Sequence, residues 1–528
     1  MQIVHIAKGS SGRHSAEVIG AKAANLARMA AAGLPVPPAF VLPVKLCKAI
    51  VDGERHAQQL LVDGLAEGIA FLEDATSLSF GGSRRPLLVS VRSGAARSMP
   101  GMLDTVLDVG CSPAAVHGLV RMTGHPRFAW DCRRRFLESY ASVVLGLDRR
   151  PFARHLADMV AAEGVAADHA LDVDAMERLT GFYLQMIEDQ DCVVPDDPME
   201  QIEASAQAVY RSWNSDRART YRQLAHLEAL HGTAVTVQAM VFGNCGLDSG
   251  SGVAFSRDPS TGAARPVIDV LFESQGEDVV SGTRTPETEG SIQFASPAVA
   301  AQLGDTLAQL EHEFGDVQDV EFTIENGKLW ILQTRDAKRT PQAALRFVMD
   351  FVKEGLLTPR EALQRLNGLD FSKLTRKRLA EVYEPAAHGT GASAGIAVGR
   401  ASFDSDSAGR IAAGGDPAIL VRPDTNTDDI VGFNIAAGIV TAIGGRTAHA
   451  ALVARQMGKP CVVGCTELAI DVAGHRARLA AASIKEGDWL SIDGEAGTIY
   501  LGQCKVVTEQ LDTELAEIER WRMAAPAL

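Results

Sequence analysis

One segment of the chain, residues 438–465, constrains the fold more than any other. Its sequence, "GIVTAIGGRTAHAALVARQMGKPCVVGC", begins with an apolar run typical of a buried strand and passes through the Gly444-Gly445 pair into a helical pattern. Gly458-Lys459-Pro460 ends that helix, and the strand-like "CVVG" follows. The segment therefore predicts a strand, a turn, a helix and a second strand, with His449 in the first turn of the helix.

The position of His449 indicates a chemistry for it. The backbone N–H groups in the first turn of a helix lack intrahelical acceptors, so they attract anions. The same helix end keeps the imidazole neutral and nucleophilic, and it would stabilise a phosphate on the ring by up to about 1 kcal/mol in an exposed setting. The pattern therefore favours nucleophilic phosphoryl transfer, and a histidine that only caps or packs is the alternative.

The composition is that of a multidomain globular protein. At 528 residues the chain is too long for one hydrophobic core, and a prior of about 150 residues per domain suggests three or four units. A formal net charge of −15 argues against the broad positive surface that nucleic acids require, although a local basic pocket for phosphate is compatible with it. We therefore expect small molecules or proteins as partners, and no nucleic acid.

The N-terminal sequence and the eight cysteines predict a reduced, cytoplasmic protein with no membrane association. The start, "MQIVHIAKGSSGRHSAEV", lacks the apolar core of a signal peptide, and no stretch reaches the length of a membrane span. Cys461 and Cys465 resemble half of a metal site, but no second pair matches their spacing. We interpret them as buried structural thiols.

The hydrophobic patterns divide the chain into a larger first part and a smaller second part. Residues 112–201 read as a helical insertion, and "AAHGTGASAGIAVG" reads as a linker, so we expect a boundary near residues 340–390. Strands with a few short helices are expected in the last domain. We expect the apolar stripe of a final helix to be an interaction surface for a partner, and packing on the chain's own histidine-bearing domain is the alternative: Leu511, Leu515, Ile518 and Trp521.

Two further segments carry candidate binding residues. In "SVRSGAARSMPGMLDT", Gly94 and Gly101 are flanked by arginines, so the backbone could approach polyphosphate. In "DVEFTIENGKLWILQTR", Asp319 and Glu321 lie two apart on a predicted strand and could share a magnesium ion. A common glycine-rich loop and a solvated polar strand face are the respective alternatives. We expect "ENG" to act as a three-residue loop, which would set Glu321 opposite Gln333.

Taken together, these segments resemble the pyruvate, phosphate dikinase family. The likeness is carried by "GAKAANLARMAAAGLPVPPAF", "LLVSVRSGAARSMPGMLDTVLDVG", "FAWDCRRRFLESYASVVLGL", "TAVTVQAMVFGNCGLDSGSGVAFSRDPSTG", "SQGEDVVSGTRTP", "DVEFTIENGKLWILQTR" and "GGRTAHAALVARQMGKPCVVGC", from about residue 18 onward. The wording "RSGAARSMPGMLDT" is closer to the dikinases than to the related phosphoenolpyruvate synthases.

The resemblance implies an α+β and α/β multidomain chain. Residues 1–340 would form an ATP-grasp domain with the insertion at 112–201, and 341–388 a helical linker. Residues 389–508 would form a swivelling β/β/α phosphohistidine domain, and 509–528 a helical tail.

The resemblance also implies roles for individual residues. His449 would attack the β-phosphorus of ATP, giving a pyrophosphohistidine and AMP, and inorganic phosphate would then remove the outer group as pyrophosphate. ATP and its phosphates would be bound by Lys22, Arg92, Gly94, Gly101, Arg135, Glu277, Asp278, Gln333 and Arg335. Asp319 and Glu321 would hold Mg²⁺. A monovalent cation, a regulatory role for Thr447 and a homo-oligomer stay open.

Two departures from the family bear on function. The family usually has "GGMTSHAA" where this chain reads "GGRTAHAA", so Arg446 adds a charge and Ala448 lacks a hydroxyl. Full-length dikinases continue into a barrel that binds pyruvate and phosphoenolpyruvate, whereas this sequence stops in the corresponding linker. We therefore expect a dikinase module that transfers its phosphoryl group to an acceptor protein or small molecule in trans. The alternative is a non-catalytic regulatory or phosphocarrier module with the same fold.

Overall fold

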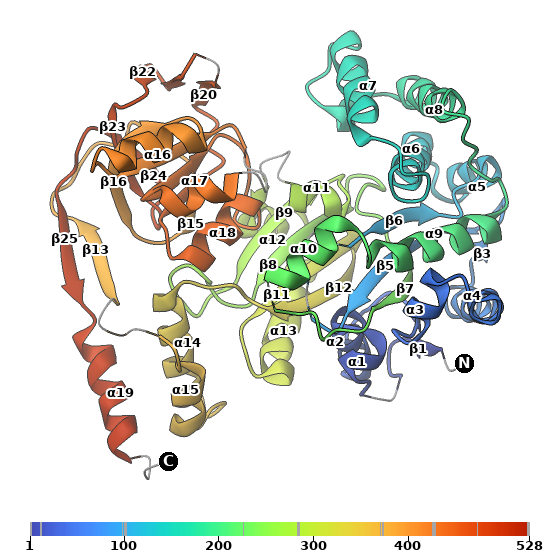
Figure 1. Cartoon of the computed structure of the whole chain (residues 1–528), viewed down its shortest axis with the longest axis horizontal. Coiled ribbons are helices and arrows are strands. Elements are labelled where there is room, and N and C mark those ends of the chain that lie inside the picture. The colour runs from blue at the N-terminus through green and yellow to red at the C-terminus, as the bar shows by residue number, and fades with distance from the viewer. Residues whose placement is uncertain are drawn as a thin grey trace. The chain divides into compact units, whose positions relative to one another are not determined.

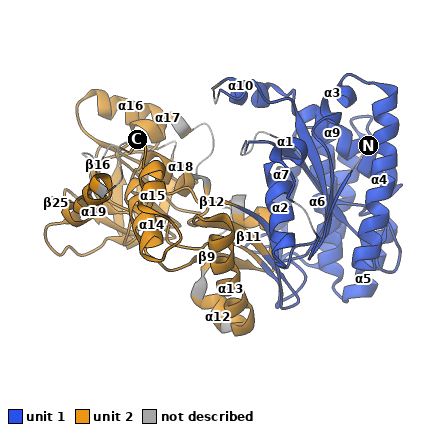
Figure 2. Ribbon diagram, turned by 90° about the horizontal axis from the view of Figure 1, so that it is seen from below, with its two compact units in different colours: residues 1–250, 323–334 blue, residues 251–322, 335–528 orange. Residues whose placement is uncertain are grey.

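The computed structural model describes residues 3–10, 13–97, 99, 103–224, 226–281, 286–369, 371, 374–424, 429–472 and 474–524 (Figure 1). The chain divides into two compact units, which are described separately (Figure 2). Unit 1 comprises Met1–Gly250 and Thr323–Thr334, and unit 2 comprises Ser251–Phe322 and Arg335–Leu528. Helices and strands occur together in both, as expected for a mixed α/β multidomain chain.

Unit 1 is built on a five-stranded sheet with the order β1-β2-β7-β5-β6. Its strands are β1 (Val4–Ile6), β2 (Ala39–Leu42), β5 (Val89–Ala95), β6 (Thr105–Val109) and β7 (Thr233–Ala239). Nearly every residue of β2, β5 and β7 is buried, because helices cover these strands. The N-terminal helices are α1 (Ala16–Ile19), α2 (Ala21–Ala31), α3 (Leu46–Val51) and α4 (Arg55–Thr76). A short pair, β3 (Ser79–Phe80) and β4 (Pro86–Leu87), precedes β5.

The segment between β6 and β7 is helical. It contains α5 (Pro113–Thr123), α6 (Pro126–Val143), α7 (Arg149–Ala162), the 3₁₀ turn η1 (Asp168–Ala170), α8 (Val173–Glu188), α9 (Pro198–Ser212) and α10 (Asp216–Leu224). Ser112, Asp148, Asp172 and Asp197 each cap the N-terminus of the helix that follows by accepting a backbone N–H. These caps explain why the helices begin where they do.

A second five-stranded sheet has the order β10-β9-β8-β11-β12. Its strands are β8 (Gly250–Phe255), β9 (Val267–Phe272), β10 (Glu287–Thr288), β11 (Gln318–Glu325) and β12 (Lys328–Asp336). The helices after β9 and β10 are α11 (Gly276–Ser281), α12 (Glu289–Ala295) and α13 (Pro297–Phe314).

The C-terminal helix α19 (Asp512–Ala524) packs on two helices of unit 2, α14 (Pro341–Lys353) and α15 (Pro359–Arg365). Ile518 is 1% and Trp521 7% exposed, and both lie in one core cluster with Phe347 and Phe351. The apolar stripe of the last helix is therefore covered by the chain itself. The expected interaction surface was wrong, because the stripe packs within the chain. The alternative, packing on the histidine domain of residues 389–508, was also wrong in its partner, since α14 and α15 cover the stripe.

Strands dominate the remainder of unit 2, as the sequence predicted. The eight-stranded sheet has the order β14-β24-β23-β16-β17-β18-β19-β15. Its strands are β14 (Ala387–His388), β15 (Thr390–Ser393), β16 (Ile396–Ser402), β17 (Ala418–Arg422), β18 (Gly438–Thr441), β19 (Cys461–Val463), β23 (Trp489–Asp493) and β24 (Thr498–Leu501). The four strands β16 to β19 run parallel. Its helices are α16 (Ser405–Ala413), α17 (Ile430–Ile435) and α18 (His449–Met457).

Two smaller sheets complete unit 2. The strands β20 (Leu468–Asp471), β21 (Arg476–Leu479) and β22 (Ala482–Lys485) form an antiparallel meander. The strands β13 (Thr375–Leu379) and β25 (Val506–Gln510) pair antiparallel, with Leu379 opposite Val506.

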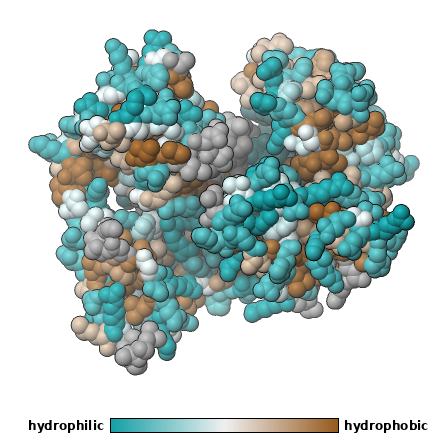
Figure 3. All heavy atoms as spheres, in the orientation of Figure 1, coloured by the Kyte–Doolittle hydropathy of each residue, from teal (hydrophilic) through white to brown (hydrophobic). Residues whose placement is uncertain are grey.

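Hydrophilic residues cover most of the face in Figure 3, interrupted by small apolar patches. No described helix is both long and apolar enough to cross a membrane. Cys461 and Cys465 are buried and unbridged, as predicted for structural thiols, and burial raises the pKa of the Cys465 thiol to about 11.

Candidate functional site

The predicted strand, turn, helix and strand around His449 are all present. Strand β18 ends at Thr441, the backbone turns through Gly444 with φ 115°, and α18 begins at His449. The helix ends at Gly458 in the left-handed conformation, with φ 62°. The residue before the helix, Ala448, provides no side-chain cap, so no hydroxyl competes for the N–H groups of the first turn. The imidazole of His449 lies outside the described side chains.

Arg455 underlies the loop that leads into α18. Its side chain is only 1% exposed, and Nη2 donates to the carbonyl oxygen of Arg446 at 2.7 Å. Nη1 donates to the carbonyl oxygen of Ala392 on β15 at 3.0 Å. Burial lowers the pKa of Arg455 to about 10, and nearby carboxylates, with Asp319 the strongest, oppose that fall. The guanidinium therefore joins the loop to its own sheet while remaining charged at neutral pH.

Asp319 has the environment of a metal-binding carboxylate. It is 1% exposed on β11, and Oδ2 accepts a hydrogen bond from Nε of Arg335 on β12 at 2.8 Å. Oδ1 is buried with no hydrogen-bond partner among the described residues. Burial raises the pKa of Asp319, Arg335 opposes the rise, and the neighbouring Glu321 adds to it. A cation would remove this unfavourable burial of negative charge.

The carboxylates fit Mg²⁺ in particular. Among the residues that the structure describes, no group of three or more His, Cys, Asp or Glu side chains is placed to hold a metal ion. Mg²⁺ in nucleotide sites is usually bound by one or two carboxylates, and the substrate phosphates supply further ligands. Asp319 and Glu321 can provide these two carboxylates. The residues present therefore fit a magnesium ion that arrives with a nucleotide.

The start of α2 and strand β5 gather three of the predicted phosphate-binding residues in unit 1. Gly20 precedes α2 with φ 81°, and a Cβ built there would lie 2.1 Å from the carbonyl oxygen of Gly94. Only glycine permits this approach. Lys22 is exposed in the first turn of α2, and Arg92 is half-buried on β5. The close approach of Gly20 to Gly94 thus places the start of α2 against β5, the two elements that carry Lys22 and Arg92.

Arg135 lies in a buried charge cluster of unit 1. Its Nε donates to Oδ2 of Asp131 at 3.0 Å, and Nδ2 of Asn244 donates to the same oxygen at 2.8 Å. Oδ1 of Asp131 accepts two hydrogen bonds from Arg134, at 2.7 and 3.0 Å. Burial alone would raise the pKa of Asp131, but Arg135 and Arg134 hold it well below its usual range. Arg135 therefore has a structural role whatever its role toward a ligand.

The other predicted residues occupy separate places. Glu277 is exposed in the first turn of α11, where Asp278 accepts the backbone N–H of Gln275 at 2.9 Å. Gln333 lies on β12. Gly101 lies outside the described residues. Thr447 is 5% exposed, and its hydroxyl oxygen has no hydrogen-bond partner among the described residues.

The turn between β11 and β12 differs from the prediction. The strands are joined by two residues, Asn326 and Gly327, with φ 48° and 71°. These angles suit a two-residue hairpin turn, so the expected three-residue loop was wrong. Strict pairing from this turn would set Val317 opposite Asp336, yet the Val317 carbonyl accepts the N–H of Ala337 at 2.9 Å. Strand β12 therefore contains one extra residue, a β-bulge.

The burial pattern locates this bulge. Leu329 and Ile331 are buried at alternate positions, and the next buried residue is Thr334, so the phase changes between Ile331 and Thr334. Gln333 falls in this interval. The face of Gln333 is therefore set by a bulge and not by the length of the turn.

The sequence patterns did not single out Asp269 or Arg455. Asp269 is a buried carboxylate in the middle of β9, and it faces the loop before α18. A single acidic residue within the apolar run "VIDVLF" was the available signal, since such a residue is seldom buried without a partner. Arg455 resembled an exposed helical arginine, and nothing in its local pattern indicated burial.

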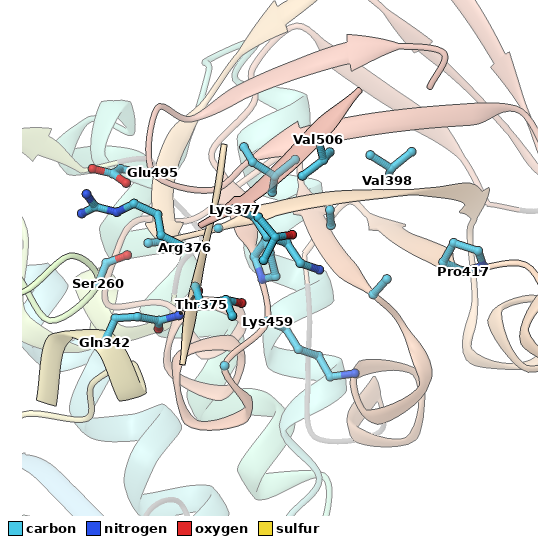
Figure 4. A pocket seen from close by; sticks show the side chains of 18 of the residues that line it. Ser260, Gln342, Thr375, Arg376, Lys377, Val398, Pro417, Lys459, Glu495 and Val506 are labelled. Atoms are coloured by element: carbon cyan, nitrogen blue, oxygen red, sulfur yellow. Dashed lines mark hydrogen bonds between the residues drawn. The ribbon is translucent and has the colours of Figure 1, made fainter. Parts of the chain in front are cut away.

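A cavity of about 700 Å³ in unit 2 lies elsewhere (Figure 4). Its lining includes Ser260, Gln342, Arg376, Lys377 and Lys459, and none of the predicted site residues. Nζ of Lys459 donates to the carbonyl oxygens of Asn434 and Ala436, so this ammonium is already engaged. The cavity is distinct from the candidate site.

Family profiles match both parts of the chain. The profile "Pyruvate phosphate dikinase, AMP/ATP-binding domain" matches residues 61–291 and 287–355, and "PEP-utilising enzyme, mobile domain" matches residues 414–497. The chain belongs to the pyruvate, phosphate dikinase family of PEP-utilising enzymes.

Among its relatives are enzymes called pyruvate, phosphate dikinase. That of Clostridium symbiosum is 39% identical over 516 residues, covering 96% of this chain and 58% of the relative. That of Rhizobium meliloti (strain 1021) is 40% identical over 522 residues, with coverage of 96% and 58%. The chloroplastic enzyme of Flaveria trinervia is 38% identical over 519 residues, with coverage of 97% and 54%. The chain thus spans somewhat more than half the length of these relatives.

One solved structure, described as the NMR solution structure of Enzyme I, aligns with 34% of this chain and 59% of its own. The sequence identity is 16% and the TM-score 0.13, too low to bear on the fold.

Proposed function

We propose that this chain is an ATP-dependent dikinase module that phosphorylates its own His449 and passes the phosphoryl group to an acceptor bound elsewhere. One observation carries the proposal: His449 opens α18, and Ala448 leaves the N–H groups of the first turn without a side-chain cap. Such a helix end accepts a phosphate and favours the neutral, nucleophilic imidazole. Membership of the dikinase family supports the same reading.

In this proposal the first part of the chain is an ATP-grasp domain and residues 389–508 form a swivelling phosphohistidine domain. Lys22, Arg92 and Arg335 neutralise the triphosphate of ATP, and Gln333 lies beside it. The pocket is completed by Gly94, Gly101, Arg135, Glu277 and Asp278. Mg²⁺ held by Asp319 and Glu321 would neutralise further charge on the β- and γ-phosphates.

The chemistry needs positioning more than proton transfer. A ring nitrogen of His449 attacks the β-phosphorus, the bond from that phosphorus to the α–β bridging oxygen breaks, and AMP leaves with the oxygen. Because the neutral imidazole offers its lone pair directly, no strong base is required. Inorganic phosphate then attacks the outer phosphorus and leaves as pyrophosphate, so that His449 carries one phosphoryl group. The acceptor is pyruvate or another small molecule, bound by a partner or a separate domain.

The test is to incubate the full chain with Mg²⁺ and ATP labelled at the β-phosphate. We expect alkali-stable label on the protein, released AMP, and loss of the label in His449→Ala. The matched control, His312→Ala, removes an exposed histidine of α13 and should label as the wild type does. Bound ATP without label would instead support a regulatory module.

A further inference from the structure

The loop before α18 is seated on strand β9 within unit 2. Asp269, in the middle of β9, is 3% exposed. A Cβ built on Gly445 would lie 2.8 Å from Oδ2 of Asp269 and 2.7 Å from Cγ of Pro286. Contacts this short are not tolerated, so the loop backbone can approach β9 only because residue 445 is glycine. The backbone at Gly445 therefore lies directly against the carboxylate of Asp269.

The groups facing Asp269 from the loop are positive. Burial raises the pKa of Asp269, and the guanidinium and backbone N–H of Arg446 are the strongest groups that oppose the rise. Arg455 and the backbone N–H of Thr447 act in the same direction. Oδ2 itself has no hydrogen-bond partner among the described residues. The charge on Asp269 is thus stabilised mainly by the segment that carries the histidine.

Arg455 makes a second set of contacts with the same segment. The guanidinium of Arg455 lies 5.1 Å from the ring centroid of Phe255 on β8. The same guanidinium holds the carbonyl oxygen of Arg446. Arg455 therefore holds the loop through the carbonyl oxygen of Arg446, whereas Asp269 lies against the backbone at Gly445.

We propose that Asp269 is the seat of the histidine loop, a positioning residue that holds residues 445–447 in place while His449 is phosphorylated. Arg446 supplies a charge interaction that the usual family motif lacks. The inference rests on the proposed function. The family motif "GGMTSHAA" has an uncharged methionine where Arg446 stands. A seat that acts through N–H groups and charges can release the loop after each phosphorylation step.

The test uses the full chain with Mg²⁺ and β-labelled ATP, in wild type, Asp269→Asn, Arg446→Met and the double variant. Asn keeps the size of the side chain and removes its charge. We expect Asp269→Asn to slow labelling about tenfold, Arg446→Met to slow it about threefold, and the double variant to match Asp269→Asn, within the usual range of coupling between sites. The ATP concentration at half-maximal rate should not change.

A second readout is hydrogen–deuterium exchange at the backbone of Arg446 and Thr447, which should become faster in Asp269→Asn. The matched controls Asp471→Asn and Arg476→Met break an exposed pair of the same kind, 2.9 Å apart on the β20–β22 meander, and should change neither readout. Gly445→Ala reaches the seat from the loop side and should slow labelling at least as much as Asp269→Asn. If a variant of Asp269 fails to fold, Gly445→Ala can still be used to test the proposal.

Unchanged labelling and unchanged exchange in Asp269→Asn would overturn the seat. A higher ATP requirement with an unchanged maximal rate would also overturn it, because Asp269 would then act in nucleotide binding. Independent, multiplicative effects of the two substitutions would overturn the part assigned to Arg446. If even the wild type is not labelled, the proposed function fails, and the exchange comparison alone decides the seat.

Discussion

Two buried aspartates, Asp131 in unit 1 and Asp319 in unit 2, have opposite electrostatic surroundings. Asp131 is 2% exposed, and both of its oxygens accept hydrogen bonds from Arg134, Arg135 or Asn244. Asp319 is 1% exposed, and among the described residues only its Oδ2 has a hydrogen-bond donor, Nε of Arg335. Burial is the same, yet the pKa is depressed at Asp131 and raised at Asp319.

The charge of Asp131 is thus fully paired within the fold, whereas that of Asp319 is only partly paired among the described residues. Removing a fully paired buried charge leaves its partners unpaired, so the cost falls on stability. Removing a partly paired carboxylate relieves unfavourable burial, so the cost falls on whatever the carboxylate would bind. The predictions below test this division, beginning with the largest expected effect.

Asp131→Ala should lower the free energy of unfolding of unit 1 by about 3–5 kcal/mol, because Arg134 and Arg135 would both lose the buried carboxylate that they contact. Urea unfolding followed by tryptophan fluorescence measures it. Glu163→Ala, which breaks a half-exposed pair with Arg178, is the control and should shift the transition far less. Comparable shifts in the two variants would remove the distinction drawn for Asp131.

Asp319→Asn should reduce ATP-dependent labelling of His449 by about a hundredfold or more, the scale seen when a group that stabilises transition-state charge is lost. The free energy of unfolding should change little, because the neutral amide keeps the shape and relieves buried charge. The labelling rate as a function of Mg²⁺ concentration, together with urea unfolding, tests both statements. A large loss of stability with normal labelling would make Asp319 a structural residue like Asp131.

Glu325 offers an intermediate case with the smallest effect. Its carboxylate accepts the backbone N–H of Phe242 at 3.0 Å, and burial raises its pKa. From the ordinary value of about 4.3 upward, the folded state retains this proton longer than the unfolded state, so stability falls as pH rises toward the folded pKa and then levels off.

Glu325→Gln does not titrate, so it should gain stability relative to the wild type across that window. Asp131 predicts the opposite sign, since its depressed pKa contributes stability that is lost only as pH falls. Urea midpoints measured from pH 3.5 to 7 compare the two. A difference between Glu325→Gln and the wild type that does not vary with pH would contradict the raised pKa.

Local patterns predicted much of the fold. The strand, turn and helix around His449 were predictable because Gly444, Gly445 and Pro460 act through backbone geometry alone. The helices of residues 112–201 were predictable because their caps and periodicity are local. The β12 bulge was not, because a bulge changes register without a signature in the turn sequence.

The surroundings of the site were less predictable than its residues. The contact of Gly445 with Asp269 joins segments far apart in the sequence, and no local period encodes it. The burial of Arg455 and of the α19 stripe likewise depends on which element lies opposite. Residue type indicates what a side chain can do, whereas tertiary packing decides whether its charge is already satisfied.

The ribbon formed by β13 and β25 has a consequence for how this architecture can change. Leu379 and Val506 are opposite each other, so the 126 residues between them, 380 to 505, enter and leave through adjacent points. Paired strands lie about 4.8 Å apart, so both ends of this segment fit almost any tight surface turn of another protein. A segment whose two ends are adjacent can be inserted or circularly permuted without a change in the path of the surrounding chain.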